Sequence, residues 1–319
     1  MNYVLIIGSS NMDLNIYLDR FPEKGETVTG GKFEQFLGGK GANQAVASVR
    51  SGAETKFIGR IGNDIFGDQM IKQLSKEGID TTRIVRDQIE SSGIAFILID
   101  KYGENMISVA PGANVKLSSD DIIKNEELIR NAKVIVVQME ISINIIEEIY
   151  RIASQGNCIK ILNPAPLKMI PKPLFKNIDI IIPNEGELNR LNFLLNCKEV
   201  EFSGTEKLIQ LSKNIANFGV KFVITTLGSK GCYVYDSEKT ESILIPAYKV
   251  QAVDTVGAGD CFNGVLASKL SKEINIIKAV KYAMAAASIA VTRKGAQKSM
   301  PYQDEIQVRY EEFNKILMI

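Results

Sequence analysis

The chain has 319 residues, of which 45% are hydrophobic and 24% charged, and its formal net charge is +1. This composition is typical of a globular protein with a large core, and its neutral balance argues against a nucleic-acid partner or binding to an anionic membrane. The chain has no histidine, which excludes Ser-His-Asp triads, Cys-His pairs and His-ligated metal sites, so any general base is Asp, Glu, Lys, Tyr or Cys.

Short β-branched segments alternate with amphipathic helical segments along most of the chain. Continuous apolar strands that alternate with helices are typical of a mostly parallel sheet covered by helices on both faces. The predicted strands are 4–7, 56–58, 134–137, 159–162, 180–182 and 222–225, and the predicted helices are 41–50, 66–77, 145–153, 207–218 and 276–292.

Two regions interrupt this alternation. Residues 15–36 contain strand-like pieces around a Pro-Glu-Lys-Gly turn, and residues 93–109 resemble a hairpin around Tyr102-Gly103-Glu104. We expect these pieces to pair as a small sheet that forms a lid over the site or a surface for dimerisation. The alternative is that they extend the main sheet.

Nothing in the sequence directs the chain out of the cytoplasm. The first ten residues, MNYVLIIGSS, lack a positive n-region and favour a first strand over a signal peptide. No apolar run approaches the ~20 residues that a membrane span needs. The four cysteines form no CxxC pair, which is typical of a reduced cytoplasmic protein with free thiols.

Polar or glycine-rich clusters follow several predicted strands. Asn11 and Asp13 come after the first strand and offer an amide and a carboxylate to vicinal hydroxyls, with an Asx turn as the alternative. The run from Gly38 to Gln44 (GGKGANQ) opens a helix without matching a P-loop, and lets backbone approach a small ligand that Asn43 contacts. A purely structural loop explains this run equally well.

Similar clusters recur further along the chain. Glu140 follows the strand 134–137, and Asn163-Pro164-Ala165-Pro166 ends the next one. Asn184 and Glu187 offer oxygens one helical turn apart, suited to the hydration shell of Mg²⁺, although an ordinary helix cap explains them as well. The segment 226–231 (TLGSKG) suits the ribose and phosphates of a nucleotide.

The segment 254–264, DTVGAGDCFNG, is the most informative one. Its residues Gly257, Ala258 and Gly259 precede Asp260 and an apolar helix pattern. Backbone N–H groups at such a helix start attract an anion, whereas Asp260 would repel one. A base that removes a proton from an attacking hydroxyl accounts for both features, and an ordinary acidic first turn is the alternative. Together the clusters predict nucleotide-dependent phosphoryl transfer to a polyhydroxylated small molecule.

On these motifs, together with PEKGETVTG and AVTRKGAQKS, the chain resembles the ribokinase-like (PfkB) carbohydrate kinases over nearly its whole length. The resemblance implies one α/β/α sandwich over 1–319 with a mostly parallel sheet, a β lid at about 15–36 and 93–109, and a homodimer formed through that lid. It implies ATP-dependent phosphorylation of D-ribose at the 5-hydroxyl; GGKGANQA and VTRKGAQ favour ribose.

The resemblance also assigns roles to residues. Asp260 would be the base, and Gly257, Ala258 and Gly259 the anion hole. The implied sugar ligands are Asn11, Met12, Asp13, Gly39, Lys40, Gly41, Asn43 and Glu140. The residues implied to face ATP and Mg²⁺ are Asn184, Glu187, Thr226, Leu227, Gly228, Ser229, Lys230, Gly231, Gly259 and Met284. The implied potassium site consists of Asp254, Val256, Ala290, Arg293, Gly295 and Ser299.

Three rival interpretations remain. A kinase of the same fold could act on 2-deoxyribose, fructose or a nucleoside. A non-catalytic sugar-binding relative is disfavoured by the intact Asp260 and its glycine run. A dinucleotide oxidoreductase is disfavoured because the GxGxxG fingerprint is missing after the first strand.

Overall fold

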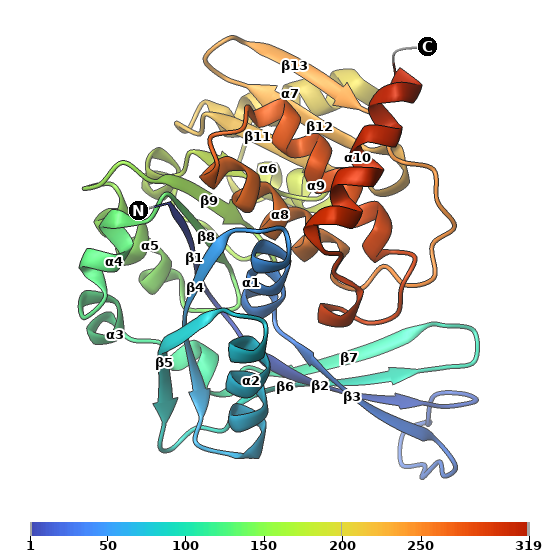
Figure 1. Cartoon of the computed structure of the whole chain (residues 1–319). Helices are drawn as coiled ribbons and strands as arrows, with labels where there is room; N and C mark the ends of the chain where they lie inside the picture. The colour runs from blue at the N-terminus through green and yellow to red at the C-terminus, as the bar shows by residue number, and fades with distance from the viewer. Residues whose placement is uncertain (1, 199, 318–319) are drawn as a thin grey trace.

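The computed structural model describes residues 2–198 and 200–317, and its main feature is a nine-stranded sheet in the order β13-β12-β11-β10-β9-β8-β1-β4-β5 (Figure 1). Neighbouring strands are parallel from β5 to β11, whereas β12 and β13 are antiparallel. The strands are β1 (Tyr3–Ile7), β4 (Glu54–Gly62), β5 (Asp80–Asp87), β8 (Val134–Gln138), β9 (Ile159–Asn163), β10 (Ile180–Ile181), β11 (Phe222–Thr226), β12 (Cys232–Asp236) and β13 (Glu241–Ile245).

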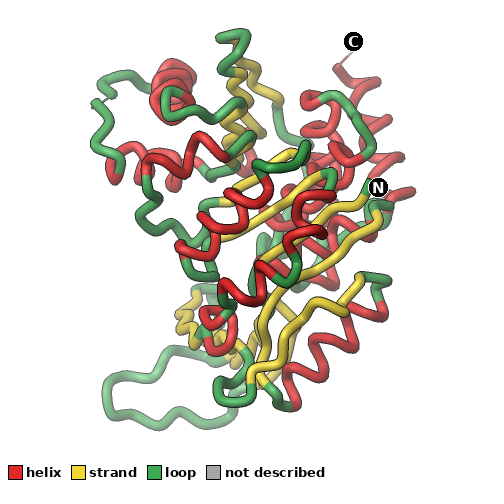
Figure 2. Tube along the Cα trace, turned by 90° about the vertical axis from the view of Figure 1, so that its left-hand side faces the viewer, coloured by secondary structure: helices red, strands yellow, loops and turns green. Residues whose placement is uncertain are grey.

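Helices cover both faces of this sheet (Figure 2). Tyr3 and Leu5 of β1 face one hydrophobic core, and Val4 and Ile6 face the other, because successive side chains of a strand point to opposite faces. The first core packs against α3 (Ser119–Ile123), α4 (Glu126–Asn131), α5 (Ile143–Ala153), α6 (Glu185–Leu194) and α7 (Gly204–Ala216). The second packs against α1 (Lys40–Arg50), α2 (Ile65–Lys76), α8 (Ala258–Ser271), α9 (Ile276–Ala290) and α10 (Gln303–Leu317).

This α/β/α architecture confirms the predicted fold class. Strands β5, β12 and β13 were not predicted. β5 reads DTTRIVRD, without a continuous apolar run, and most of β13 is exposed at the sheet edge. None of the described helices combines the length and apolar character needed to cross a membrane.

A separate four-stranded sheet projects from the main body, in blue and cyan in Figure 1. Its order is β3-β2-β6-β7, with β2 and β6 parallel and the other pairs antiparallel. The strands are β2 (Asn11–Tyr17), β3 (Lys32–Gly38), β6 (Gly93–Ile99) and β7 (Asn105–Ala110). β2 begins four residues after β1 ends, so this sheet starts where the main sheet presents the carboxyl ends of its parallel strands.

Candidate active site

The site is centred on the start of α8, which Gly257 opens. Gly257 is the N-cap with φ of 75°, a left-handed conformation that side chains disfavour. The N–H of Ala258 donates to the Thr255 carbonyl over a long 3.3 Å. Asp260 stands in the first turn of the helix and is 7% exposed. The helix start places partial positive charge beside this carboxylate.

Two side chains of α1 hold the Asp260 carboxylate. Asn43 donates from Nδ2 to Oδ2, and Gln44 donates from Nε2 to Oδ1, each over 2.9 Å. Helices α1 and α8 approach closely here because Gly264 lacks a side chain, since a Cβ at this position would lie 2.3 Å from the Gln44 carbonyl oxygen. The glycine one turn after Asp260 therefore brings the two donors within reach of the carboxylate.

Asp13 and Glu140 add negative charge on the side of the second sheet. Burial, and then the charges of Glu140 and Asp260, raise the pKa of Asp13 from its ordinary value of 3.8 to about 7. Lys40 is the compensating cation, and the pKa of its ammonium is raised chiefly by the charge of Asp260, against the lowering effect of burial. A site rich in carboxylates suits a ligand that brings several hydroxyl donors.

Glu140 and Asn11 are each held by a specific partner. Glu140 Oε2 accepts a short hydrogen bond from the Ser9 hydroxyl and one of 3.1 Å from the Lys40 backbone N–H. Asn11 Oδ1 accepts from Asn114 Nδ2 over 2.8 Å, which leaves the Asn11 amide nitrogen as the group it can offer to a ligand. Both sugar-site candidates are thus oriented before any ligand arrives.

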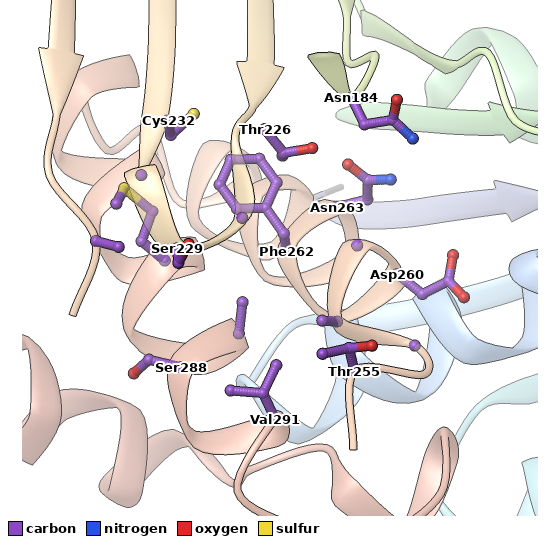
Figure 3. Close-up of a pocket in the computed structure, with 18 of the residues that line it drawn as sticks. Asn184, Thr226, Ser229, Cys232, Thr255, Asp260, Phe262, Asn263, Ser288 and Val291 are labelled. Carbon is purple, nitrogen blue, oxygen red and sulfur yellow. The ribbon is translucent and has the colours of Figure 1, made fainter. Parts of the chain in front are cut away.

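A cavity of about 800 Å³ extends from Asp260 and Lys40 to the turn between β11 and β12. Figure 3 shows Asp260 at one end, Phe262 and Asn263 along the wall, and Ser229 and Cys232 towards the other end. Polar groups line the end near Asp260. The wall away from it is largely apolar and includes Ile182, Val250, Phe262, Met284, Ala287 and Val291.

Comparison with known proteins decides the family. The model of the pfkB family carbohydrate kinases matches residues 1–303. The chain belongs to the pfkB family of carbohydrate kinases.

Its relatives within the pfkB family include enzymes for two sugars. The ribokinase of Haemophilus influenzae is 39% identical over 300 residues, covering 94% of this chain and 95% of the relative. The deoxyribokinase of Salmonella typhi is 31% identical over 317 residues, covering 99% of each chain. The structure of Arabidopsis thaliana ribokinase complexed with ribose and ATP superposes with a TM-score of 0.89 at 30% identity, covering 97% of this chain and 98% of the other.

Of the residues predicted to hold a sugar, only Lys40 and Asp260 are among the lining residues of this cavity. Asn11 and Asp13 lie on β2 instead of in a loop after β1. The Met12 side chain between them is 1% exposed and packs with Leu14, Ile61 and Met70 in a separate hydrophobic cluster. Met12 can therefore offer a ligand only its backbone. Gly39, Lys40, Gly41 and Asn43 form the junction between β3 and α1 and its first turn.

The residues predicted to face the nucleotide are also divided. Thr226, Gly228, Ser229, Gly231 and Met284 line the cavity. Leu227 and Lys230 are not among its lining residues: Leu227 is buried, and Lys230 forms an exposed ion pair with Glu185 at 3.2 Å. The glycine turn therefore presents only part of its length to the cavity.

Asn184 and Glu187 cap α6 and line the cavity at the same time. Asn184 Oδ1 accepts from the Glu187 N–H, and Glu187 Oε2 accepts from the Asn184 N–H, both over 2.8 Å. Burial raises the pKa of Glu187. The helix-cap interpretation is thus compatible with the ligand-binding one.

The residues predicted to bind potassium cluster behind the α8 start. Asp254 accepts from the N–H groups of Val256 and Gly295 over 2.9 and 2.8 Å. The Ala290 carbonyl accepts from the Arg293 N–H over 3.0 Å, and the Arg293 guanidinium pairs with Glu305. The Ser299 hydroxyl donates to the Ala296 carbonyl over 2.7 Å. Among the described residues, no group of three or more Asp, Glu or Cys side chains could hold a metal.

Four buried polar residues of the site were not predicted from the sequence. They are Ser9, Gln44, Asn114 and Asn163, and each contacts a predicted residue or lines the cavity. Ser9 lies in the segment 8–13 (GSSNMD) with Asn11 and Asp13, and Gln44 lies in GGKGANQA, so the predicted residues beside them could have pointed to both. Asn114 follows the β6–β7 hairpin in a segment without any motif.

Proposed function

We propose that this protein is an ATP-dependent kinase that transfers the γ-phosphoryl group of ATP to the 5-hydroxyl of D-ribose. The observation that carries the proposal is Asp260, a buried carboxylate that lines a large cavity at the N-terminus of α8. A base at this place is useful only if a hydroxyl next to it attacks an anionic group. Similarity to the ribokinase of Haemophilus influenzae supports ribose as that acceptor.

The proposed reaction is an in-line displacement. Asp260 accepts the proton of the 5-hydroxyl as that oxygen bonds to the γ-phosphorus, and the bond to the β–γ bridging oxygen breaks, releasing ADP. Backbone N–H groups at the start of α8, those of Gly257 and Gly259 foremost, face the charge on the transferred group. The protein contributes mainly positioning and electrostatic stabilisation, because this transition state asks for little covalent chemistry.

Sugar recognition is assigned to the acidic groups close to Asp260 and Lys40. Asp13 and Glu140 accept hydrogen bonds from sugar hydroxyls, and Asn11 donates one. A site built to pair a hydroxyl rejects an analogue that lacks it, because its own polar groups then lose their partner. We assign discrimination at the 2-hydroxyl to Asp13 and Asn43.

The nucleotide occupies the remaining length of the cavity. The apolar wall with Met284 suits a base, and Thr226 to Gly231 suits the ribose and phosphates. Asn184 and Glu187 fit a hydrated Mg²⁺, because both line the cavity and Glu187 has one carboxylate oxygen outside the cap. The magnesium ion neutralises phosphate charge when it is bound.

A potassium ion is proposed behind the anion hole. Carboxylate, hydroxyl and carbonyl oxygens of Asp254, Ala290 and Ser299 supply the donor type that potassium prefers. The 293–299 segment packs on Gly257, where a Cβ would lie 3.0 Å from the Ala296 Cα. An ion in this segment would stabilise the turn that opens α8 without touching substrate.

The second sheet is proposed as a lid that also forms a homodimer. Strands β3, β6 and β7 carry exposed apolar side chains, and in the β6–β7 pair Phe96 lies opposite Ser108 and Ile97 opposite Ile107. Contiguous exposed apolar surface of this kind marks an interaction site. The exposed side chains are Phe33, Phe96, Met106, Ile107 and Val109, each at least half exposed.

The test is a coupled ADP-release assay with D-ribose, 2-deoxyribose, fructose and adenosine, each with and without KCl. We expect ribose to give the highest kcat/KM, and KCl to raise it. A preference for 2-deoxyribose, the substrate named in the Salmonella typhi relative, would overturn the substrate while keeping the chemistry. Tight ribose binding without turnover on any sugar would overturn the assignment as a kinase.

A further inference from the structure

A chain of buried amide groups ends on the carboxylate of Asp260. Gln44 is 0% exposed, and its Nε2 donates to Asp260 Oδ1 over 2.9 Å and to Asn163 Oδ1 over 3.2 Å. Its Oε1 accepts from Gln138 Nε2 over 2.7 Å. Both amide hydrogens and the oxygen of Gln44 are therefore used. Since an ionised carboxylate only accepts, these bonds fix which way the amide faces.

At the end away from Asp260, this series of amide groups is anchored in the main sheet. Gln138 and Asn163 are the last residues of the parallel strands β8 and β9, and they are direct partners in the register. Gln138 is 0% exposed, and a Cβ on Gly8 of the neighbouring β1 segment would lie 2.0 Å from its Oε1, so this packing depends on glycine. Gln44 thus connects the carboxyl ends of the central strands β8 and β9 to the carboxylate of Asp260.

We propose that Gln44 is a positioning residue that sets the orientation of the Asp260 carboxylate; the proposal rests on the proposed function. Asn43 and Gln44 each donate to a different oxygen of Asp260, which fixes the plane of the carboxylate. The remaining lone pairs then point in set directions, one of which faces the acceptor hydroxyl. Asn43 is also proposed to contact the sugar, whereas we assign to Gln44 no direct contact with it.

The first experiment replaces Gln44 and measures turnover. Gln44→Met keeps the volume and removes the bond to Asp260, which we expect to lower kcat about 10- to 100-fold while the KM for ribose changes less than about threefold. Ser48→Ala is the matched control, because Ser48 is buried on α1 one turn further along and bonds to Thr55, away from Asp260. Equal losses in both variants would overturn the proposal.

A pH profile separates positioning from packing. Gln44→Glu places a second carboxylate against Asp260, so the pair shares a proton and its pKa rises. Because the base must be ionised, the acidic limb of the kcat profile should move to higher pH. An unchanged profile in Gln44→Glu would overturn the proposal.

A stability cycle tests the same contact without turnover. In Gln44→Glu the folded state holds the shared proton more tightly than the unfolded chain, so the unfolding equilibrium constant should rise about tenfold or more between pH 5 and pH 8. In the double variant with Asp260→Asn this rise should be smaller, because only burial then raises the pKa of the new carboxyl, and an equal rise in the double variant would overturn the proposal. Failure of the wild type to phosphorylate ribose would refute the proposed function, while the cycle still decides the coupling of Gln44 to Asp260.

Discussion

Asn114 donates a hydrogen bond of 2.8 Å to the side-chain oxygen of Asn11, across 103 residues of sequence. Asn114 also accepts from the Ser10 N–H over 2.9 Å, so one buried amide holds two consecutive residues at the start of β2. It stands in the 3₁₀ turn Gly112–Lys116 that follows β7. The segment that leaves the second sheet therefore orients Asn11, which we propose as a sugar ligand.

Removing Asn114 should weaken sugar binding more than turnover. In Asn114→Ala the Asn11 amide can rotate, and we expect the KM for ribose to rise about tenfold with a smaller change in kcat, as for a lost hydrogen bond of ~1–2 kcal/mol. Steady-state kinetics measures this. Asn125→Ala is the control, since Asn125 is also buried but bonds to the Asp121 backbone. A similar rise in KM in the control would contradict the prediction.

Replacing the base should leave sugar binding largely intact. Asp260→Asn keeps the shape of the side chain and removes the proton acceptor, so kcat should fall by about 10²–10⁴. Isothermal titration with ribose should still detect binding, and thermal unfolding should show a folded protein. A variant with near-normal kcat would show that another group takes the proton.

Sugar affinity should rise with pH through about 7. Burial and the charges of Glu140 and Asp260 raise the pKa of Asp13 to about 7, and sugar hydroxyls that donate to Asp13 would favour its ionised form. Binding then releases a proton at lower pH, so the Kd for ribose should fall from pH 5.5 to pH 8. Titrations in buffers of different ionisation enthalpy would detect the proton. A Kd that is flat over this range would argue that Asp13 does not accept from the sugar.

The raised pKa of Asp13 also predicts that folding stability falls as pH rises, whereas sugar affinity increases. Because the folded-state pKa of Asp13 lies above the unfolded value, its contribution is most favourable below about pH 4 and is lost as pH rises to 7. The free energy of unfolding of Asp13→Asn, relative to that of the wild type, should therefore be larger at pH 8 than at pH 5, by about 1–3 kcal/mol. Urea unfolding at both pH values measures the difference, and an equal gain at both would contradict the assignment.

A charge on the second sheet should dissociate the proposed dimer. Ile107 is 57% exposed, and Ile107→Lys would place an ammonium in an apolar interface. Sedimentation should show the wild type as a dimer and the variant as a monomer at micromolar concentration. Phe202→Lys, at an exposed apolar residue just before α7, should stay dimeric. A monomeric wild type would refute the proposed assembly.

The sequence predicted the parallel part of the main sheet because strands such as β1 and β8 are buried on both faces and read as continuous apolar runs. It predicted Asp260 because a carboxylate after three small residues conflicts with an ordinary anion site. Gln44 could not be assigned, since its partner lies 216 residues away and the packing of α1 on α8 at Gly264 brings them together. The sequence could not show that the Met12 side chain is buried, because the register that turns it away from Asp13 is set by pairing with β3 and β6.

Strand β2 belongs to the second sheet, yet it also carries Asn11 and Asp13, which we propose as ligands of the sugar. In this proposal, acceptor recognition and enclosure are two ends of one continuous piece of backbone. A protein of this architecture that lost the projecting sheet would lose its acceptor ligands in the same deletion. The sheet is therefore not a removable accessory, and any relative without it must recognise its acceptor through different residues.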